Sequence, residues 1–335
     1  MSRRHVLTAS CLAAALLIPG AAAAQDGDAA LTVYSGRSES LVGPVMESFT
    51  AATGIDVEVK YADTAELAAL LLEEGDRSPA DIYFAQDAGA LGAVADAGLL
   101  ATLPEALLTA VPAGLRDADG RWTGVSGRAR TTAYTTTREL ELPDSILDFT
   151  DPEWAGRIGW APANGSFQAF VTALRVIEGE EAARAWLEGI LANSPVAYPK
   201  NTAAVEGVAA GEVDVAFVNH YYLLQLQAER GDDYPVAQKF FGGGDPGSLV
   251  NVAGVGIIAS TDQPDEAVAF VEYLLSDAAQ AYFSDTTFEY PLIDGLDADP
   301  RLPALDTVEA PDVDLSDLAD LKGTVELLQA VGAID

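Results

Sequence analysis

Cysteine and histidine are almost absent from this 335-residue chain. Its only cysteine is Cys11, and its two histidines are His5 and His220. Cys11 and His5 lie in a leader that we expect to be removed, so the mature chain has no disulfide, no thiol nucleophile and no thiolate metal site. A Ser-His-Asp arrangement could form only around His220, and zinc held by imidazole or thiolate has no support. No spacing of carboxylates favours glycoside hydrolysis, and we expect that the protein is not an enzyme.

Positive charge is also scarce, since Lys and Arg together number 18 against 52 Asp and Glu, for a formal net charge of -34. We therefore expect no nucleic acid partner. The acidic residues are spread along the chain, which is typical of a solvated surface suited to high salt and does not identify a ligand. Nucleotide binding has no support, because no GxGxxG turn follows the first predicted strand and no GxxxxGKS/T loop occurs.

A long apolar run occurs only near the N-terminus. Residues 1–24 contain a pair of arginines, the apolar run 12–18 and a closing Ala-Ala-Ala, which is the order of an export signal peptide cleaved before Gln25. Residues 2–7, SRRHVL, also resemble a twin-arginine signal. Cys11 precedes the apolar run, which argues against a lipid anchor. No later stretch approaches the length of a membrane span, so we expect an exported protein of the periplasm.

The first part of the mature chain alternates strands with helices. The expected elements are strands at 31–34, 55–61 and 81–84, and helices from about 39, from 63 to 72, and from about 88 to 100. Asp63 and Glu66 match the N-cap box that opens a helix. This β-α-β-α-β-α order is typical of a doubly wound α/β sheet.

Two β-rich runs, 123–137 and 249–258, bracket a second α/β series, and both suit hinge strands that cross between two lobes. The second series has expected strands at 157–160, 196–198 and 213–218 and helices at 166–178, 180–192 and 203–210, and further helices follow at 264–275, 277–283 and 321–331. We therefore predict lobe 1 from residues 25–127 plus about 252–284, and lobe 2 from residues 128–251 plus about 285–335.

The strand at 213–218 leads into Asn219, His220 and two adjacent tyrosines, Tyr221 and Tyr222. Leucines follow at helical spacing, so the tyrosines stand where a strand turns into a helix. Loops at the carboxyl ends of strands are where open α/β sheets hold their ligands. Two neighbouring phenols can offer two hard oxygen donors to one ion, or they can pack as amphipathic residues with their hydroxyls at the surface.

Longer segments that span nearly the whole mature chain carry a family resemblance. They are LTVYSGRSESLVGPV (31–45), LLEEGDRSPADIYFAQDAGALGAVADAGLL (71–100), SGRARTTAY (126–134), EWAGRIGWAPANGSFQAFVTALR (153–175), AVEGVAAGEVDVAFVNHYYL (204–223) and TFEYPL (287–292). In this order they resemble the ferric-iron-binding periplasmic proteins of bacterial ABC importers, also called bacterial transferrins, of the extracellular solute-binding family. The resemblance implies a two-lobed type II periplasmic-binding-protein fold that closes on Fe(III), and a monomer that delivers the ion to an inner-membrane ABC permease.

The resemblance also implies which residues bind. Tyr221 and Tyr222 match the family's phenolate ligands, whose protons a trivalent cation displaces. A synergistic anion (carbonate, phosphate or citrate) completes the coordination of the metal. The polar residues that match its binding site or the surrounding shell are Arg37, Ser38, Gln86, Asn164, Ser166, Asn201 and Asn219. Residues 164–166 precede an expected helix, whose free N–H groups suit an anion.

The chain departs from the family's pattern at three positions. Many members have a histidine in the first loop, a glutamate after the third strand and a further tyrosine near the anion helix, where we find Ser38, Ala85 and Phe167. Only two protein ligands are therefore matched. The anion, water, or a carboxylate such as Asp87 or Glu39 must supply the remaining positions of an octahedral ion.

These departures leave several alternatives open. The same fold could bind a small phosphonate-like anion or a polyamine without metal. Arg37 could hold an anion or be a surface arginine at a helix start. Arg128 and Arg130 could neutralise buried charge near the cleft or form structural salt bridges. For His220 we expect an exposed or supporting role and not ligation, because its tyrosine neighbours would face the cleft.

Overall fold

The computed structural model describes residues 30–335, so the predicted signal peptide and twin-arginine motif lie outside the described residues. The first α/β series consists of β1 (Leu31–Ser35), α1 (Glu39–Thr53), β2 (Val57–Tyr61), α2 (Thr64–Glu74), β3 (Ile82–Ala85) and α3 (Ala88–Asp96), followed by α4 (Glu105–Thr109). Strand β1 pairs in parallel with both β2 and β3. The predicted β-α-β-α-β-α order of this part is therefore confirmed.

The second series follows a long strand, β4 (Thr123–Thr135). It comprises β5 (Ile158–Trp160), α5 (Gly165–Glu178), α6 (Glu180–Ala192), β6 (Val196–Ala197), α7 (Asn201–Ala210), β7 (Val215–Asn219), α8 (Tyr221–Arg230) and β8 (Val236–Lys239). Strand β5 pairs in parallel with β6 and β7. The chain then returns through β9 (Val250–Ile257), α9 (Pro264–Leu274), α10 (Asp277–Asp285), β10 (Tyr290–Pro291) and α11 (Leu321–Val331).

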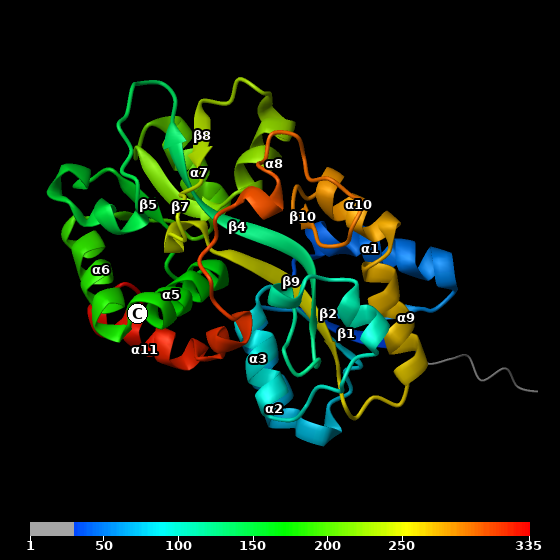
Figure 1. The fold of residues 1–335 in the computed structure, drawn as a ribbon. Coiled ribbons are helices and arrows are strands. Elements are labelled where there is room, and N and C mark those ends of the chain that lie inside the picture. The colour runs from blue at the N-terminus through cyan, green and yellow to red at the C-terminus, as the bar shows by residue number, and fades with distance from the viewer. Residues whose placement is uncertain (1–29) are drawn as a thin grey trace, which may run out of the picture.

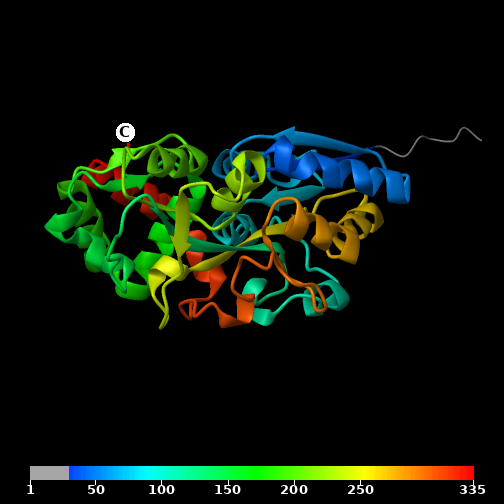
Figure 2. The same ribbon diagram turned by 90° about the horizontal axis from the view of Figure 1, so that it is seen from above.

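Strands β4 and β9 join the two parallel groups into one sheet of order β2-β1-β3-β9-β4-β7-β5-β6. The first part of β4 pairs antiparallel with β9, from Thr123 opposite Val255 to Ala129 opposite Val250. From Arg130 onward it pairs antiparallel with β7, and from Thr132 to Thr135 also with β8. In Figure 1 and Figure 2 these two long strands run between the two groups of helices. The predicted crossover runs at 123–137 and 249–258 thus form two neighbouring strands that connect the halves.

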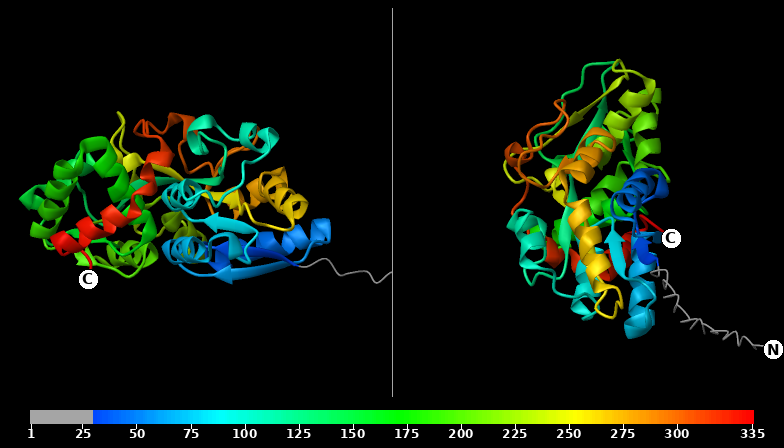
Figure 3. Two further views of the ribbon diagram at one scale, coloured as in Figure 1. Left: turned by 90° about the horizontal axis from the view of Figure 1, so that it is seen from below. Right: turned by 90° about the vertical axis from the view of Figure 1, so that its right-hand side faces the viewer.

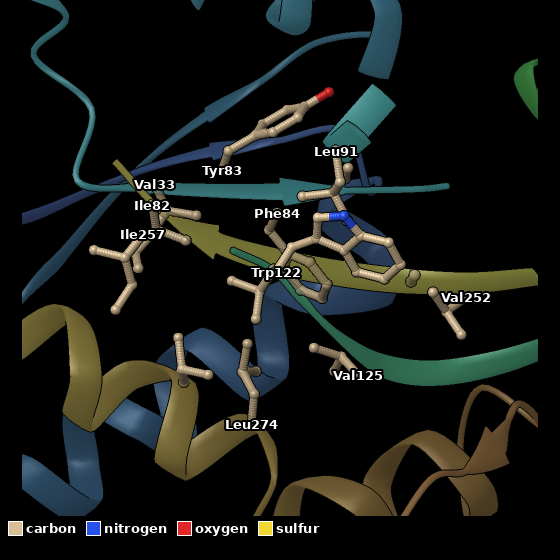
Figure 4. Close-up of a cluster of buried hydrophobic side chains, with 14 of the residues drawn as sticks. Val33, Ile82, Tyr83, Phe84, Leu91, Trp122, Val125, Val252, Ile257 and Leu274 are labelled. Carbon is tan, nitrogen blue, oxygen red and sulfur yellow. The ribbon is translucent and has the colours of Figure 1, made fainter. Parts of the chain in front are cut away.

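Each half has its own hydrophobic core. Figure 4 shows the core of the first half, where Trp122 packs among side chains of β3, β4 and β9 such as Phe84, Val125 and Val252. The core of the other half is rich in aromatic rings. In it Phe149 and Trp186 pack against Phe217 of strand β7. Two separately packed bodies joined by strands are the arrangement that hinge closure requires.

The C-terminal segment contacts both halves. A short 3-10 turn at Leu315–Ala319 packs against α3, and α11 packs against α5 and α6. Figure 3 shows the red α11 beside the green helices of the second half. No helix in the part of the chain that the structure describes is both long and apolar enough to span a membrane.

Some local predictions were wrong. Asp63 is the N-cap residue of α2, but its side chain makes no capping hydrogen bond, so the predicted box does not form. The third predicted helix ends at Asp96, and Leu100 instead forms a β-bridge with Ile258. Strands β8 and β10 were not predicted, because each is too short to show a periodic pattern.

Candidate functional site

The two adjacent tyrosines stand at the first turn of α8, directly after the buried strand β7. Their ring centroids are 4.3 Å apart, and the Tyr221 hydroxyl donates a hydrogen bond of 3.0 Å to the Tyr222 oxygen. Tyr221 is 1% exposed and Tyr222 is half-buried. Burial and the neighbouring phenol raise the pKa of Tyr222. Two converging oxygens at this distance form a pair of hard donors that one ion could bridge.

Both phenols face a cleft of about 1290 Å³. One wall comes from the loops after β1, β2 and β3, and the other from the starts of α5, α7 and α8 together with α11. The predicted site residues that line this cleft are Arg37, Ser38, Gln86, Asn164, Tyr221 and Tyr222. Three others, Ser166, Asn201 and Asn219, are buried and do not line it. The cleft therefore brings residues of both halves to the phenol pair.

Asn164, Ser166 and Asn201 form one hydrogen-bonded network at the starts of α5 and α7. The Asn164 side-chain oxygen accepts from the Ser166 amide at 3.0 Å and its hydroxyl at 2.6 Å. The Asn201 amide nitrogen donates to Asn164 and to Ser166, both at 3.1 Å. These bonds fix the first turn of α5, whose free N–H groups can receive an anion.

Arg37 is not the surface residue that one alternative suggested, because it is only 2% exposed. Its guanidinium forms an ion pair with Glu289, which also accepts a hydrogen bond from Ser126. Burial works against the positive charge, but Glu289 and the two phenols hold the pKa of Arg37 above its ordinary value. Arg37 thus lines the cleft as a fixed, permanently charged group.

His220 is fully buried, so of the two roles expected for it the exposed one is excluded and the supporting one is left. Its Nδ1 accepts from the Ala129 amide at 3.1 Å, and its Nε2 lies 2.8 Å from the Phe288 carbonyl oxygen, to which it must donate. Burial lowers the pKa of His220 to about 4. Both nitrogens of the neutral ring are engaged, so His220 ties β4 to the segment before β10 and supports the tyrosines.

The three departures from the family's pattern have different surroundings. Ser38 is exposed at the edge of the cleft, whereas Ala85 is fully buried inside β3 and the next residue, Gln86, lines the cleft. Phe167 is buried, and its ring packs against Trp160. Position 85 therefore offers the cleft no side chain, and Gln86 supplies an amide there.

Four carboxylates line the cleft, Glu39, Asp63, Glu66 and Asp87. Asp87 also caps α3 by accepting from the Ala90 amide at 3.0 Å, and burial raises its pKa. Residues 30–335 contain no group of three or more His, Cys, Asp or Glu side chains placed to hold a metal ion.

Several cleft residues were not predicted. Tyr61 ends β2, Lys200 precedes α7, and Gln225 lies one turn into α8. Tyr61 is the last residue of a predicted strand, so the rule that led to Tyr221 and Tyr222 could also have found it. Lys200 and Gln225 carry no such signal, because only the packing of the two halves brings them to the cleft.

Comparisons with known proteins agree with this geometry. Residues 77–317 match the family model described as bacterial extracellular solute-binding protein. The chain is 33% identical to the Fe(3+)-binding periplasmic protein of Serratia marcescens over 96% of both chains. It is 34% identical to the major ferric iron-binding protein of Neisseria meningitidis, over 95% of this chain and 97% of that one.

Solved structures give the same result. Iron-bound HitA from Pseudomonas aeruginosa has a TM-score of 0.86 at 35% identity, covering 90% of this chain and 99% of the other. The Trichodesmium protein IdiA (FutA), in complex with iron and citrate, has a TM-score of 0.77 at 28% identity, with the same coverage. The predicted resemblance and the type II periplasmic-binding-protein fold are confirmed, and the chain belongs to the bacterial extracellular solute-binding protein family.

Proposed function

We propose that this protein is the solute-binding component of an ABC importer and captures Fe(III) in the cleft between its two halves. Tyr221 and Tyr222 are the metal ligands, and each loses its proton to become a phenolate when the ferric ion binds. The observation that carries the proposal is the pair of phenol oxygens 3.0 Å apart at the edge of the cleft. Phenolate oxygen is a hard donor, which suits a hard trivalent cation.

Two phenolates fill only two positions of an octahedral ion, so a synergistic anion completes the site. The anion binds at the first turn of α5 beside Asn164, and Gln86 and Arg37 also line the cleft. Ser166 and Asn201 hold Asn164 in place from behind, and Asn219 anchors Arg130. Ser38, Glu39, Asp87 or water can occupy positions that the anion leaves open.

Capture and release follow from the two-body architecture. In the open form the ferric ion meets the phenols of the second half, and closure brings in the groups of the first half. The proposed hinge lies in β4 near residues 128–136 and in β9 near residues 251–256. At this hinge lobe 1 moves against lobe 2. Lobe 1 consists of residues 25–127 plus about 252–284, and lobe 2 of residues 128–251 plus about 285–335. The ferric ion and its anion can contact both lobes at once only in the closed form. Their binding therefore stabilises the closed form over the open one. A permease in the inner membrane that favours the open form then receives the ion from a periplasmic monomer.

The names of the relatives favour this proposal over capture of a metal-free phosphonate-like anion or polyamine. A metal-free anion would not need paired phenols. The carboxylates of Glu39, Asp63, Glu66 and Asp87 along the cleft could receive a polyamine, but a polyamine would not need two converging phenol oxygens either. Binding of a solute is enough to explain the residues of the cleft, and no catalytic role for them is needed.

Iron retention tests the proposal. We expect the wild-type protein to keep about one ferric ion per chain after gel filtration in the presence of citrate. The variants Tyr221→Phe and Tyr222→Phe should each lose most of it, because each removes a ligand oxygen. Tyr61→Phe is the matched control, since it removes a phenol oxygen from the other wall of the same cleft, at the end of β2. Equal retention by all four proteins would contradict the assignment of the ligands.

A further inference from the structure

The chain joins the two halves once more, close to its C-terminus. Residues 314–331, which we call the C-terminal strap, contain the 3-10 turn Leu315–Ala319 and the helix α11. The turn packs on α3 of the first half and also touches α5, whereas α11 packs on α5 and α6 of the second half. In Figure 1 the red strap passes from α3 to the green helices. The strands β4 and β9 are therefore not the only main-chain connection between the halves.

The turn is anchored in the first half by burial and by close contact with α3. Leu315 and Leu318 are 2% and 1% exposed and belong to the hydrophobic core of that half. Gly89 faces the Leu318 carbonyl group, and a Cβ atom at Gly92 would lie 3.2 Å from that of Ala319. The turn can leave α3 only by exposing both leucine side chains to water, which is unfavourable.

The start of α11 is anchored in the second half by hydrogen bonds and burial. Arg175 of α5 donates to the carbonyl oxygen of Asp320 at 3.1 Å, to its carboxylate at 2.8 Å, and to the Thr324 hydroxyl at 2.9 Å. The hydroxyls of Thr324 and Thr172 lie 2.7 Å apart inside the protein. Leu328, one turn further along, is fully buried in the aromatic core of this half.

The two anchors are almost adjacent in the sequence. The first half holds Leu318 and the second half holds Asp320, with only Ala319 between them. Two residues of fully extended chain span at most about 7 Å, so these two points cannot move farther apart than that. We call the line along which α3, the turn and α5 meet the seam. The width of the seam is therefore limited in every state of the protein in which both anchors hold.

The strap also borders the cleft, because Leu321 and Val325 of α11 line it. Away from the seam, the cleft is lined by the N-terminal turns of α2 in the first half and α7 in the second. We propose that the C-terminal strap keeps the seam at a nearly constant width, so that the cleft opens mainly between α2 and α7, by rotation about a line through the strap and the β4–β9 pair. This inference rests on the hinge closure of the proposed function and adds a third element that restricts its direction.

Distances between spin labels test the proposal. The only cysteine of the chain lies in the leader that we expect to be removed, so two introduced cysteines carry the only labels of the mature protein. The seam pair is Ala93→Cys on α3 with Lys322→Cys on α11. The reference pair is Ala69→Cys on α2 with Ala210→Cys on α7, both at exposed positions.

Both pairs are measured in iron-free protein and again with ferric citrate. The seam distance should change by less than about 3 Å, because the 3-10 turn already spans part of the 7 Å that two residues allow. The reference distance should shorten by more than that when the cleft closes.

A longer strap separates the effect of the short connection from that of packing. Inserting Gly-Ser-Gly-Ser after Ala319 keeps both anchors and adds up to about 14 Å of reach, so the seam distances of the iron-free protein should spread over more than about 5 Å. The same insertion after Gly295, in an exposed loop, is the matched control and should leave them as in wild type. If the first insertion prevents folding, Arg175→Met weakens the second anchor and should also spread the seam distances, with Arg184→Met on α6 as its control.

Unchanged seam distances in the folded variant with the insertion after Ala319 would overturn the proposal, because packing and not the short connection would then fix the seam. A wild-type seam distance that changes as much as the reference distance would also overturn it. A reference distance that does not respond to ferric citrate would contradict closure on iron, and hence the proposed function. The comparison of the two insertions in iron-free protein would still decide whether the strap limits the seam.

Discussion

Gly89 of α3 lies against the backbone of Leu318, so closely that a Cβ atom at this position would overlap the Leu318 carbonyl oxygen. The helix accepts the C-terminal segment because it has no side chain there. The same segment continues into α11, which packs against α5 and α6 in the other half. The contact at Gly89 therefore fixes one end of a segment that touches both halves.

Replacing Gly89 by alanine should destabilise the protein. The new methyl group collides with backbone, which cannot rotate away, so we expect a loss of about 1–3 kcal/mol in the free energy of unfolding. Chemical denaturation measures it. Gly114→Ala is the control, because a Cβ there meets nothing within 4 Å, and its effect should stay within about 0.5 kcal/mol. Equal effects of the two substitutions would show that the segment does not pack on α3 as described.

Replacing Glu289 by glutamine should be more costly. Glutamine keeps the shape of the side chain but leaves Arg37 as an unpaired buried cation, and breaking a buried pair in this way costs about 3–5 kcal/mol. Denaturation of the iron-free protein again gives the measurement. The double variant Arg37→Met with Glu289→Leu removes both charges and should recover much of the loss. A cost below about 1 kcal/mol for Glu289→Gln would mean that the pair is open to solvent.

The buried His220 should make stability depend on pH. Its pKa is about 4 in the folded protein against 6.5 for a free histidine, so between these pH values the unfolded chain binds a proton that the folded chain does not. The free energy of unfolding should therefore fall as pH is lowered from 6.5 to 4, by about 3 kcal/mol in total from this residue. Comparing iron-free wild type with His220→Gln, without a histidine tag, isolates the effect because all other titrating groups are shared. An identical pH dependence in both proteins would contradict a neutral, buried imidazole.

Much of the fold could be predicted from the sequence because it depends on local patterns. The strand at 213–218 is a run of β-branched and aromatic residues, and the helix after Tyr221 has leucines at helical spacing. The tyrosine pair was found because the chain makes the two residues neighbours and because strand ends are where ligands bind.

Other features depend on contacts between distant segments. The partner of Arg37 is 252 residues away, and no pattern near either residue indicates the pair. Arg128 and Arg130 lie in a stretch rich in β-formers, but both are buried and neither forms an ion pair among residues 30–335, so the alternative of structural salt bridges was wrong. Arg128 lies opposite Asn251 of β9 and Arg130 opposite Asn219 of β7, so the surroundings of the two arginines are set where β4 changes its pairing.

The visible spectrum of the protein with ferric citrate tests the central claim most directly, because a phenolate bound to Fe(III) gives a charge-transfer band that free ferric citrate lacks. We predict that wild type and Tyr61→Phe develop this band at about one iron per chain, and that the double variant Tyr221→Phe with Tyr222→Phe remains colourless while folded. A band of undiminished strength in the double variant, or no band in wild type, would contradict the account.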